Sequence, residues 1–186
     1  MTLRCLQSPR RPHRRRGNMV PLVALAIAGG IGALLLINTV SFGNDTSSDA
    51  KVDDFYNAII HIETQMRARY ASDFTRFGEF ANSGQRLANL KMVNEGRIVG
   101  GIATTPWGGV MQANGVSRTR FYLLIRNVAL TPAVPLDACV NIINRLSGKP
   151  GVASFWGAGS SDIWSPVSHA QAVSLCNEGE TWVSFQ

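Results

Sequence analysis

An uncharged apolar run from residue 19 to residue 37 follows directly on a cluster of arginines, and this pairing limits the possible folds more than any other feature. As an α-helix rising about 1.5 Å per residue, the run would be about 28 Å long, close to the roughly 30 Å hydrocarbon thickness of a bilayer. The residues after it, 38–53, contain one lysine and three aspartates. The positive-inside rule therefore predicts a single-pass inner-membrane protein, anchored by residues 18–40, with its N-terminus inside and its C-terminus outside.

The net charge of +6 resembles that of a nucleic-acid-binding protein, but the basic residues are unevenly distributed. Six of the 18 basic residues are arginines of the first 17 residues, which leaves 12 basic residues against 12 acidic ones in the remainder. A domain that binds nucleic acid carries its excess positive charge in its folded part. We therefore expect no nucleic-acid partner and interpret residues 1–17 as a basic leader peptide.

Small residues recur on one face of the apolar run, at Ala24, Ala28 and Gly32. In lipid such a face allows a second helix to approach closely, which predicts helix packing in a membrane or a filament. The alternative is an ordinary single-pass anchor that tolerates glycine. The following segment SFGND contains the strongest local breaker, Gly43, where we expect a hinge.

A conventional secretory signal fits the N-terminus poorly. The apolar run is longer than the usual 7 to 15 residues of such signals and ends in INTVSFGND, without a small-residue cleavage motif. A cut between Gly17 and Asn18 is more natural, because it removes the basic leader and keeps the apolar segment in the mature protein.

The segment of about residues 48–72 is predicted to be an amphipathic helix, with Ser48 as its N-cap. His61 in this helix is interpreted as a packing or surface residue and not as a ligand. The apolar residues at helical spacing are Val52, Phe55, Tyr56, Ile59, Ile62, Met66 and Tyr70.

Beyond this helix, glycines separate short β-like runs at 97–104, 108–115 and 120–130, with further strands expected in VASFWGAG and TWVSF. A turn is expected at PWGG, 106–109, and a short helix near 85–92. Residues 136–146 have the spacing of an amphipathic helix. The fold class predicted for residues 41–186 is therefore α+β, with an antiparallel sheet over residues 97–186.

Two cysteines remain after removal of a leader that contains Cys5, and both lie in the part expected outside the cytoplasm. A disulfide between Cys139 and Cys176 is the simplest interpretation. The alternatives are weak: no histidines stand at the spacing of a zinc site, and the separation is not that of a CxxC redox motif.

These parts together resemble a type IVb pilin, similar to the pilins of conjugative thin pili and bundle-forming pili. The resemblance rests on the leader ending RRRG, the apolar helix 19–37, its amphipathic continuation to about Tyr70, ATTPWGG, PLDACVNIINRL and the late CNEGETWVSF. It implies the type IV pilin fold, with a long N-terminal helix packed on the sheet and a C-terminal D-region closed by Cys139 and Cys176. It also implies a major or minor filament subunit used in adhesion or mating contact.

The resemblance implies particular partners as well. The precursor would meet the lipid bilayer, a prepilin peptidase and a pilus assembly platform, and the mature chain would form an extracellular helical homo-oligomer. In such pilins the fifth residue after the cut is normally glutamate, but here Leu22 occupies that position. Either the rule is relaxed and register comes from helix packing, or the chain is a minor subunit or a pilin-like protein with a different assembly role.

Other functions have weaker support in the sequence. Ser168, His169 and Asp162 could be drawn as a catalytic triad, but no nucleophile elbow, P-loop or HExxH motif accompanies them. We therefore expect no enzyme, no cofactor, no metal site and no small-molecule substrate. Four tryptophans could line a ligand groove, although core and interface positions are the expected ones. The remaining alternatives are a non-polymerising inner-membrane-anchored periplasmic binding protein and a secretion-system pseudopilin. The four tryptophans are Trp107, Trp156, Trp164 and Trp182.

Overall fold

A helix over residues 48–70 carries the apolar face that the sequence predicts, and we call it the long helix. The computed structural model describes residues 48–78, 81–159 and 161–186. Phe55, Ile59, Ile62 and Met66 lie along the long helix at intervals of three or four residues and have no exposed surface. Residue 48 is already helical, so the N-cap predicted at Ser48 is not at that residue.

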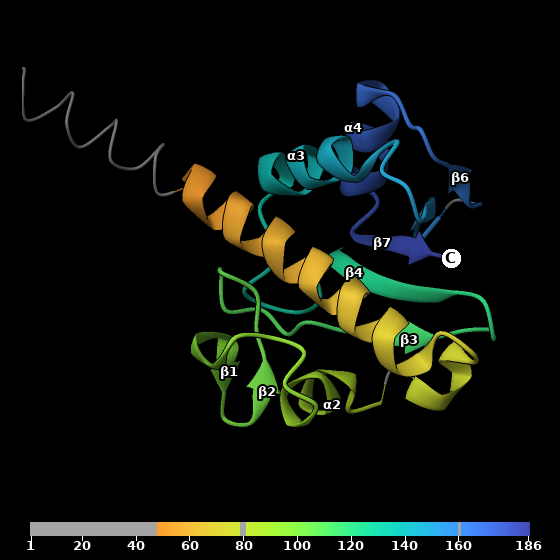
Figure 1. Cartoon of the computed structure of the whole chain (residues 1–186). Coiled ribbons are helices and arrows are strands. Elements are labelled where there is room, and N and C mark those ends of the chain that lie inside the picture. The colour runs from red at the N-terminus through yellow and green to blue at the C-terminus, as the bar shows by residue number, and fades with distance from the viewer. Residues whose placement is uncertain (1–47, 79–80, 160) are drawn as a thin grey trace, which may run out of the picture. The chain divides into compact units, whose positions relative to one another are not determined.

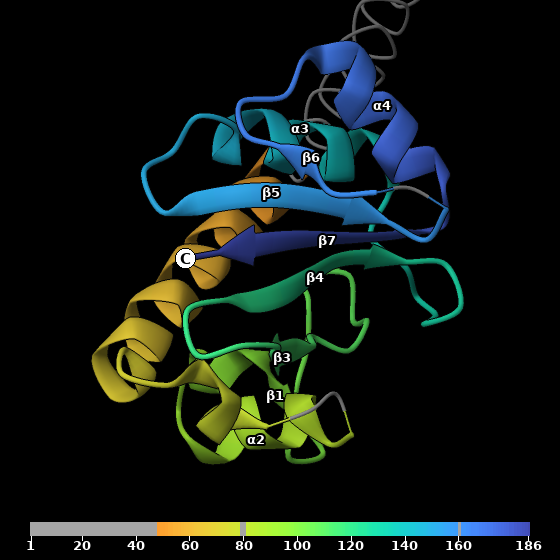
Figure 2. The same ribbon diagram turned by 90° about the vertical axis from the view of Figure 1, so that its right-hand side faces the viewer.

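The long helix packs against a five-stranded sheet in which every neighbouring pair is antiparallel, in the order β3-β4-β7-β5-β6. The C-terminal strand therefore lies at the centre of the sheet (Figure 2). This arrangement confirms the predicted α+β class with an antiparallel sheet. The strands are β3 (Ala113–Gly115), β4 (Phe121–Asn127), β5 (Val152–Gly157), β6 (Ile163–Trp164) and β7 (Glu180–Phe185).

The two faces of the sheet have different environments. In Figure 2 the long helix passes behind the strands, so this view looks onto the face that the helix does not cover. The helix-facing side is filled by Phe121, Phe155 and Phe185, all fully buried. Phe121 and Phe185 stack with ring centroids 5.1 Å apart. This aromatic layer joins neighbouring strands beneath the long helix and forms the centre of the core.

Shorter elements lie on either side of the long helix (Figure 1). On one side are α3 (Leu136–Leu146) and α4 (His169–Asn177), and on the other are α2 (Ser83–Asn89) and the two-stranded ribbon of β1 (Ile98–Val99) and β2 (Ile102–Ala103). The described residues also include two short 3-10 helices, η1 (Phe74–Phe77) and η2 (Glu95–Arg97). The predicted helix at 136–146 is confirmed with its bounds.

The strand predicted over 97–104 is wrong, because this segment folds back on itself as the β1–β2 hairpin. Its two central residues, Gly100 and Gly101, have φ values of 58° and 79°. A two-residue turn with positive φ at both positions matches the right-handed twist of the flanking strands, and glycine adopts it without a steric penalty.

The strand predicted over 108–115 is shortened to β3. Val110 instead forms an isolated bridge with Thr104, which closes the expected turn around PWGG. The short helix predicted at 85–92 occupies 83–89, and it stops before Lys91, which has a φ of 52° and so leaves the helical region.

The helix α4 was not predicted, because its apolar residues are spread around the helix and do not form one clear apolar face. A local signal for it exists: the Ser168 side chain accepts from the Gln171 amide, and the Gln171 side chain accepts from the Ser168 amide. This capping box marks the start of a helix in the sequence.

Across the part of the chain that the structure describes, no helix combines the length and apolarity needed to cross a membrane. The predicted span at 19–37 lies outside the described residues, and so do the leader 1–17 and the hinge at Gly43.

Candidate functional site

Several residues singled out by the sequence lie outside the described residues. They are Gly17 and Asn18 at the expected cleavage site, Leu22, the small face of Ala24, Ala28 and Gly32, and Gly43. Their roles stay predictions.

The predicted disulfide is present between Cys139 and Cys176, with Cα atoms 6.0 Å apart. Cys139 lies in the first half of α3 and Cys176 near the end of α4, and both are fully buried. The bond therefore joins two helices that flank the sheet, and it closes a region containing β5, β6 and most of α4.

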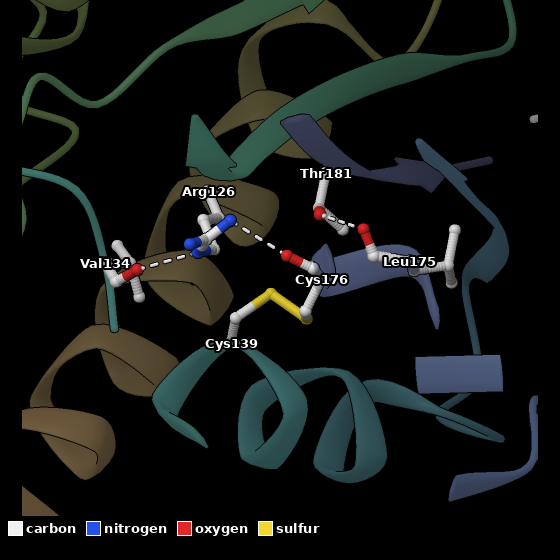
Figure 3. The surroundings of a disulfide bond; sticks show 6 residues. All are labelled: Arg126, Val134, Cys139, Leu175, Cys176 and Thr181. Carbon is white, nitrogen blue, oxygen red and sulfur yellow. Dashed lines mark hydrogen bonds between the residues drawn. A yellow bond between two sulfur atoms is a disulfide. The ribbon is translucent and has the colours of Figure 1, made fainter. Parts of the chain in front are cut away.

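Hydrogen bonds hold the end of α4 against the sheet around this disulfide (Figure 3). Arg126 of β4 donates from Nη1 to the carbonyl oxygen of Cys176 at 2.8 Å and from Nε to that of Val134 at 3.0 Å. Thr181 of β7 donates its hydroxyl to the Leu175 carbonyl oxygen at 2.9 Å. The Cys176 and Leu175 carbonyl groups lie in the last turn of α4, where the i+4 amide of the helix interior is missing, and the Val134 carbonyl group lies just before α3.

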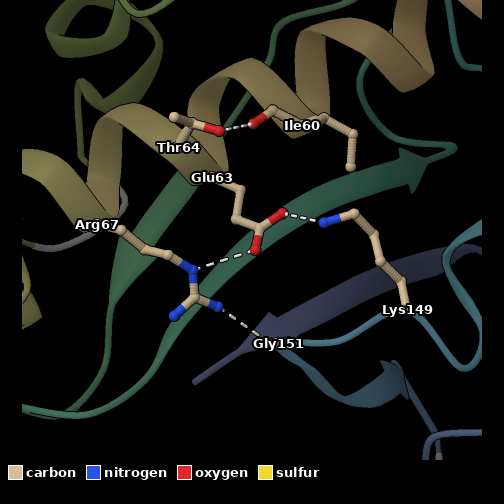
Figure 4. A network of polar contacts seen from close by, with 6 residues as sticks. All are labelled: Ile60, Glu63, Thr64, Arg67, Lys149 and Gly151. Atoms are coloured by element: carbon tan, nitrogen blue, oxygen red, sulfur yellow. Dashed lines mark hydrogen bonds and ion pairs between the residues drawn. The ribbon is translucent and has the colours of Figure 1, made fainter.

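A buried carboxylate on the long helix binds the segment after α3 (Figure 4). Glu63 is only 5% exposed, and its two oxygens accept from Arg67 Nε at 3.1 Å and Lys149 Nζ at 2.8 Å. Arg67 also donates from Nη2 to the Gly151 carbonyl oxygen at 3.3 Å. A carboxylate this deeply buried is retained only when it is paired, and here two cations pair with it.

Two neighbouring aspartates of the long helix form ion pairs with elements on its two different sides. Asp53 pairs with Arg145 of α3, and Asp54 pairs with Arg97 of η2. Burial lowers the pKa of Arg97 below its ordinary value, because the charged guanidinium loses water there. Both pairs lie in the first two described turns of the helix, so the elements on either side are tied to the same end of it.

The four tryptophans separate into two groups. Trp107 packs edge-on against Phe55 of the long helix, with ring centroids 5.9 Å apart, and belongs to the core side. The other three belong to the uncovered face of the sheet: Trp182 in β7 pairs with Trp156 in β5, and Ser154 pairs with Trp164 in β6.

A groove of about 300 Å³ opens on this uncovered face. We call it the aromatic groove, and it is lined by Asn114, Val116, Tyr122, Trp156, Asp162 and Trp182. Trp156 and Trp182 are possible groove residues by residue type alone, whereas Tyr122 and Asp162 are recognised only from the strand pairing and from the position of Asp162 in the fold.

The residues considered for a catalytic triad have other partners in the structure. Ser168 caps α4, His169 lies 3.0 Å from the side-chain nitrogen of Asn144, and Asp162 accepts from Ser154. His61 is exposed on the long helix. Within residues 48–78, 81–159 and 161–186, no three His, Cys, Asp or Glu side chains gather in a way that could hold a metal ion.

No protein-family model matches the chain, and no curated protein matches it. The function is therefore argued from its own residues.

Proposed function

We propose that this chain is a structural subunit, major or minor, of a type IVb pilus. The leader 1–17 is removed, the apolar segment 18–40 anchors the precursor in the inner membrane, and the same segment then polymerises with copies of itself into an extracellular filament. Residues 41–186 form the head that covers the filament.

One observation carries this proposal: the long helix, which packs on the sheet, is the first element of the described residues and follows the apolar run 19–37 in the sequence. An α+β head built on an amphipathic helix, with a disulfide near its C-terminus, is the arrangement that the family resemblance implies. Continuity of the predicted helix 19–37 with the long helix is part of the proposal.

The driving force for assembly is physical. In the membrane the apolar run is surrounded by lipid, and on extraction only the same segment of neighbouring subunits offers an equivalent environment. Burying 19 residues at about 1 kcal/mol for each larger side chain favours this exchange over exposure to water by tens of kcal/mol. The near-neutral charge after residue 17 permits close lateral packing of heads.

N-terminal sequencing of the mature protein tests the proposal, in cells that also produce a prepilin peptidase and an assembly platform. We expect the mature chain to begin at Asn18 and to be recovered in filaments sheared from the cell surface. Gly17→Val is expected to leave the precursor uncut in the membrane, whereas Ser8→Val, a matched change away from the cut, is expected to be processed normally.

Two results would contradict the proposal. A mature chain beginning near Phe42 would mean that the apolar segment is a discarded signal. Recovery of the processed chain only with the inner membrane, despite assembly of other pilins by the same cells, would favour an anchored periplasmic binding protein or a pseudopilin.

A further inference from the structure

Two rows of residues cross the uncovered face of the sheet and supply four of the residues that line the aromatic groove, Asn114, Tyr122, Trp156 and Trp182. Residues directly opposite each other on antiparallel strands project to the same side. The first row, from β3 to β6, is Asn114, Tyr122, Ser184, Ser154 and Trp164. In the second row, Trp182 stands between Leu124 and Trp156. All five strands of this sheet therefore contribute to one surface.

The rings of this surface differ in exposure. Trp182 is 3% exposed and forms the floor, and its indole nitrogen donates to Glu180 at 2.8 Å. Tyr122 and Trp156 are partly exposed beside it, and Trp164 at the edge is 57% exposed. Aromatic rings on the solvent side of a sheet, away from the core, are uncommon unless they contact something.

Polar groups of fixed position accompany the rings. Asp162 Oδ2 accepts from the Ser154 hydroxyl at 3.2 Å and lies 3.9 Å from Arg120 Nη1. The Arg120 guanidinium stands 4.9 Å from the centre of the Trp164 ring. Asn114 adds an amide with both donor and acceptor atoms. The groove thus has aromatic walls and a polar rim, and the Asp162–Arg120 ion pair lies at that rim.

A buried hydroxyl lies in the first row as well. Ser184, between Tyr122 and Ser154, is fully buried, and its Oγ has no hydrogen-bond partner among the residues that the structure describes. Buried hydroxyls are normally satisfied, so the polar capacity of this face exceeds what its described neighbours use.

We propose that the aromatic groove binds a neutral saccharide, one or two sugar residues of a glycan. A sugar ring has an apolar C–H face that packs on an aromatic side chain, and hydroxyls at its edge that both donate and accept hydrogen bonds. Tyr122 and Trp156 would pack against the ring, and Asn114 and Asp162 would bind its hydroxyls. The groove volume is at the lower end of the range of about 300–1,000 Å³ typical of small-molecule sites.

Two other occupants fit less well. A quaternary ammonium ion would be repelled by the Arg120 guanidinium, which lies beside Asp162 and already faces the Trp164 ring. A second copy of the chain would place this face at the centre of an interface, where charged residues are depleted. The saccharide site does not rest on filament assembly, so the two proposals can fail separately.

The test is a tryptophan fluorescence titration of the purified full-length chain in a polyoxyethylene detergent, which avoids the sugar or choline headgroups of other detergents. The probes are glucose, galactose, mannose, N-acetylglucosamine, lactose, maltose and N,N′-diacetylchitobiose, with choline chloride as the cation arm. We expect saturable binding of at least one sugar and none of choline. Binding is expected to weaken at least tenfold in Tyr122→Ala and Asp162→Ala.

Two matched variants separate binding from folding. Tyr122→Phe keeps the ring and is expected to retain binding, and Trp107→Phe changes a tryptophan of the opposite face and is expected to bind as the unaltered chain does. The proposal is overturned if no sugar saturates the signal, if choline does, or if Tyr122→Ala binds sugar normally. It is also overturned if sedimentation velocity shows that Tyr122→Ala abolishes self-association without any sugar effect, since a second copy would then occupy the groove.

Discussion

The side-chain nitrogen of Lys149 lies 2.8 Å from Oε2 of Glu63, and this contact joins the turn after α3 to the middle of the long helix. Arg67, one turn further along the helix, binds the other oxygen of the same carboxylate. The two cations differ from Glu63 in burial, because their side chains are 27% and 36% exposed while that of Glu63 is 7% exposed. Water can compensate either cation for a lost partner, but it cannot do so for Glu63.

Because Glu63 is the most buried member, we expect the substitutions of Lys149 and Arg67 to have non-additive effects on the free energy of unfolding. Lys149→Met and Arg67→Met are each expected to lower the free energy of unfolding by about 1–2 kcal/mol, since the remaining cation still pairs with Glu63. The double variant is expected to cost more than the sum, by about 1 kcal/mol, because it leaves a buried charge alone. Adding Glu63→Gln should recover part of the loss. Urea unfolding followed by near-UV circular dichroism measures each step.

The matched control for net charge is the pair Lys51→Met and Arg118→Met, both at exposed positions. It is expected to change the free energy of unfolding by less than about 0.5 kcal/mol for each substitution. Strict additivity of Lys149→Met and Arg67→Met, with no recovery from Glu63→Gln, would show that Glu63 gains nothing from this pairing.

The disulfide is expected to contribute strongly to the stability of the head. Replacing Cys139 and Cys176 together by serine should lower the free energy of unfolding by about 4 kcal/mol on the chain-entropy model, since the bond closes a long loop. Because both sulfur atoms are buried, the bond should resist dithiothreitol in the native protein and become reducible once urea unfolds it.

Cys5→Ser is the matched control, because Cys5, the third cysteine of the sequence, lies in the predicted leader and outside the head. It is expected to leave the stability of the head unchanged. Mass spectrometry of non-reduced peptides should link residues 139 and 176. Equal reduction rates in the native and the unfolded protein would contradict the buried position of the bond.

The fold leaves almost no room for a side chain at Gly115. A Cβ atom added there would lie 1.9 Å from the carbonyl oxygen of Phe74, so the backbone of η1 would have to move. Gly115→Ala is therefore expected to destabilise the protein by about 1–3 kcal/mol. At Gly96 the added atom would have no neighbour within 4 Å. Gly96→Ala should be close to neutral, and equal midpoints of thermal unfolding for the two variants would contradict the close approach at Gly115.

Long periodic segments could be predicted from the sequence. Residues 48–70 and α3 repeat apolar side chains every three or four positions, and each buries one face, so local spacing and tertiary burial agree. The antiparallel sheet and the Cys139–Cys176 pair could also be predicted from the sequence. The order of the strands could not be predicted, because no local feature of β7 indicates that this C-terminal strand pairs with both β4 and β5.

The set of residues that line the aromatic groove could not be predicted from the sequence. Trp156 and Trp182 were candidates by residue type, but their neighbours depend on strand register. Register brings Trp182 opposite Trp156 and places Tyr122 opposite Asn114. Since a shift of one residue would turn every side chain to the other face, the composition of this surface could not be obtained before the pairing was known.

The cap that Asp73 forms on η1 should make the stability of the protein depend on pH at acidic pH. Its carboxylate caps η1 by accepting from the Thr75 amide at 3.0 Å and from the Thr75 hydroxyl. These bonds hold the pKa of Asp73 below its ordinary value, and the bond from the Thr75 hydroxyl contributes most to this shift. Because the folded pKa is the lower one, the stabilisation is present above the unfolded pKa of about 3.9 and is lost as pH falls through the folded value.

An NMR titration of the Asp73 carboxyl carbon in Thr75→Val should show this pKa rising toward the ordinary value. Thr64→Val is the matched control, because the Thr64 hydroxyl donates within the long helix to the Ile60 carbonyl oxygen. It should leave the pKa of Asp73 as it is. An unchanged titration in Thr75→Val would exclude the cap as the cause.

The small face of the apolar run gives the sharpest test of how the proposed filament is built. Ala28→Leu adds bulk to the face that includes Ala24 and Gly32, and small residues there would allow neighbouring helices to approach closely. Ala26→Leu is the same chemical change about half a turn around the helix. Both variants are more apolar than the original chain, so both should enter the membrane and be cut before Asn18. We expect Ala28→Leu to reduce sheared surface filaments at least tenfold and Ala26→Leu to leave their yield unchanged. Equal yields from the two would mean that this face makes no helix contact, and a loss of membrane insertion in either would locate the defect before assembly.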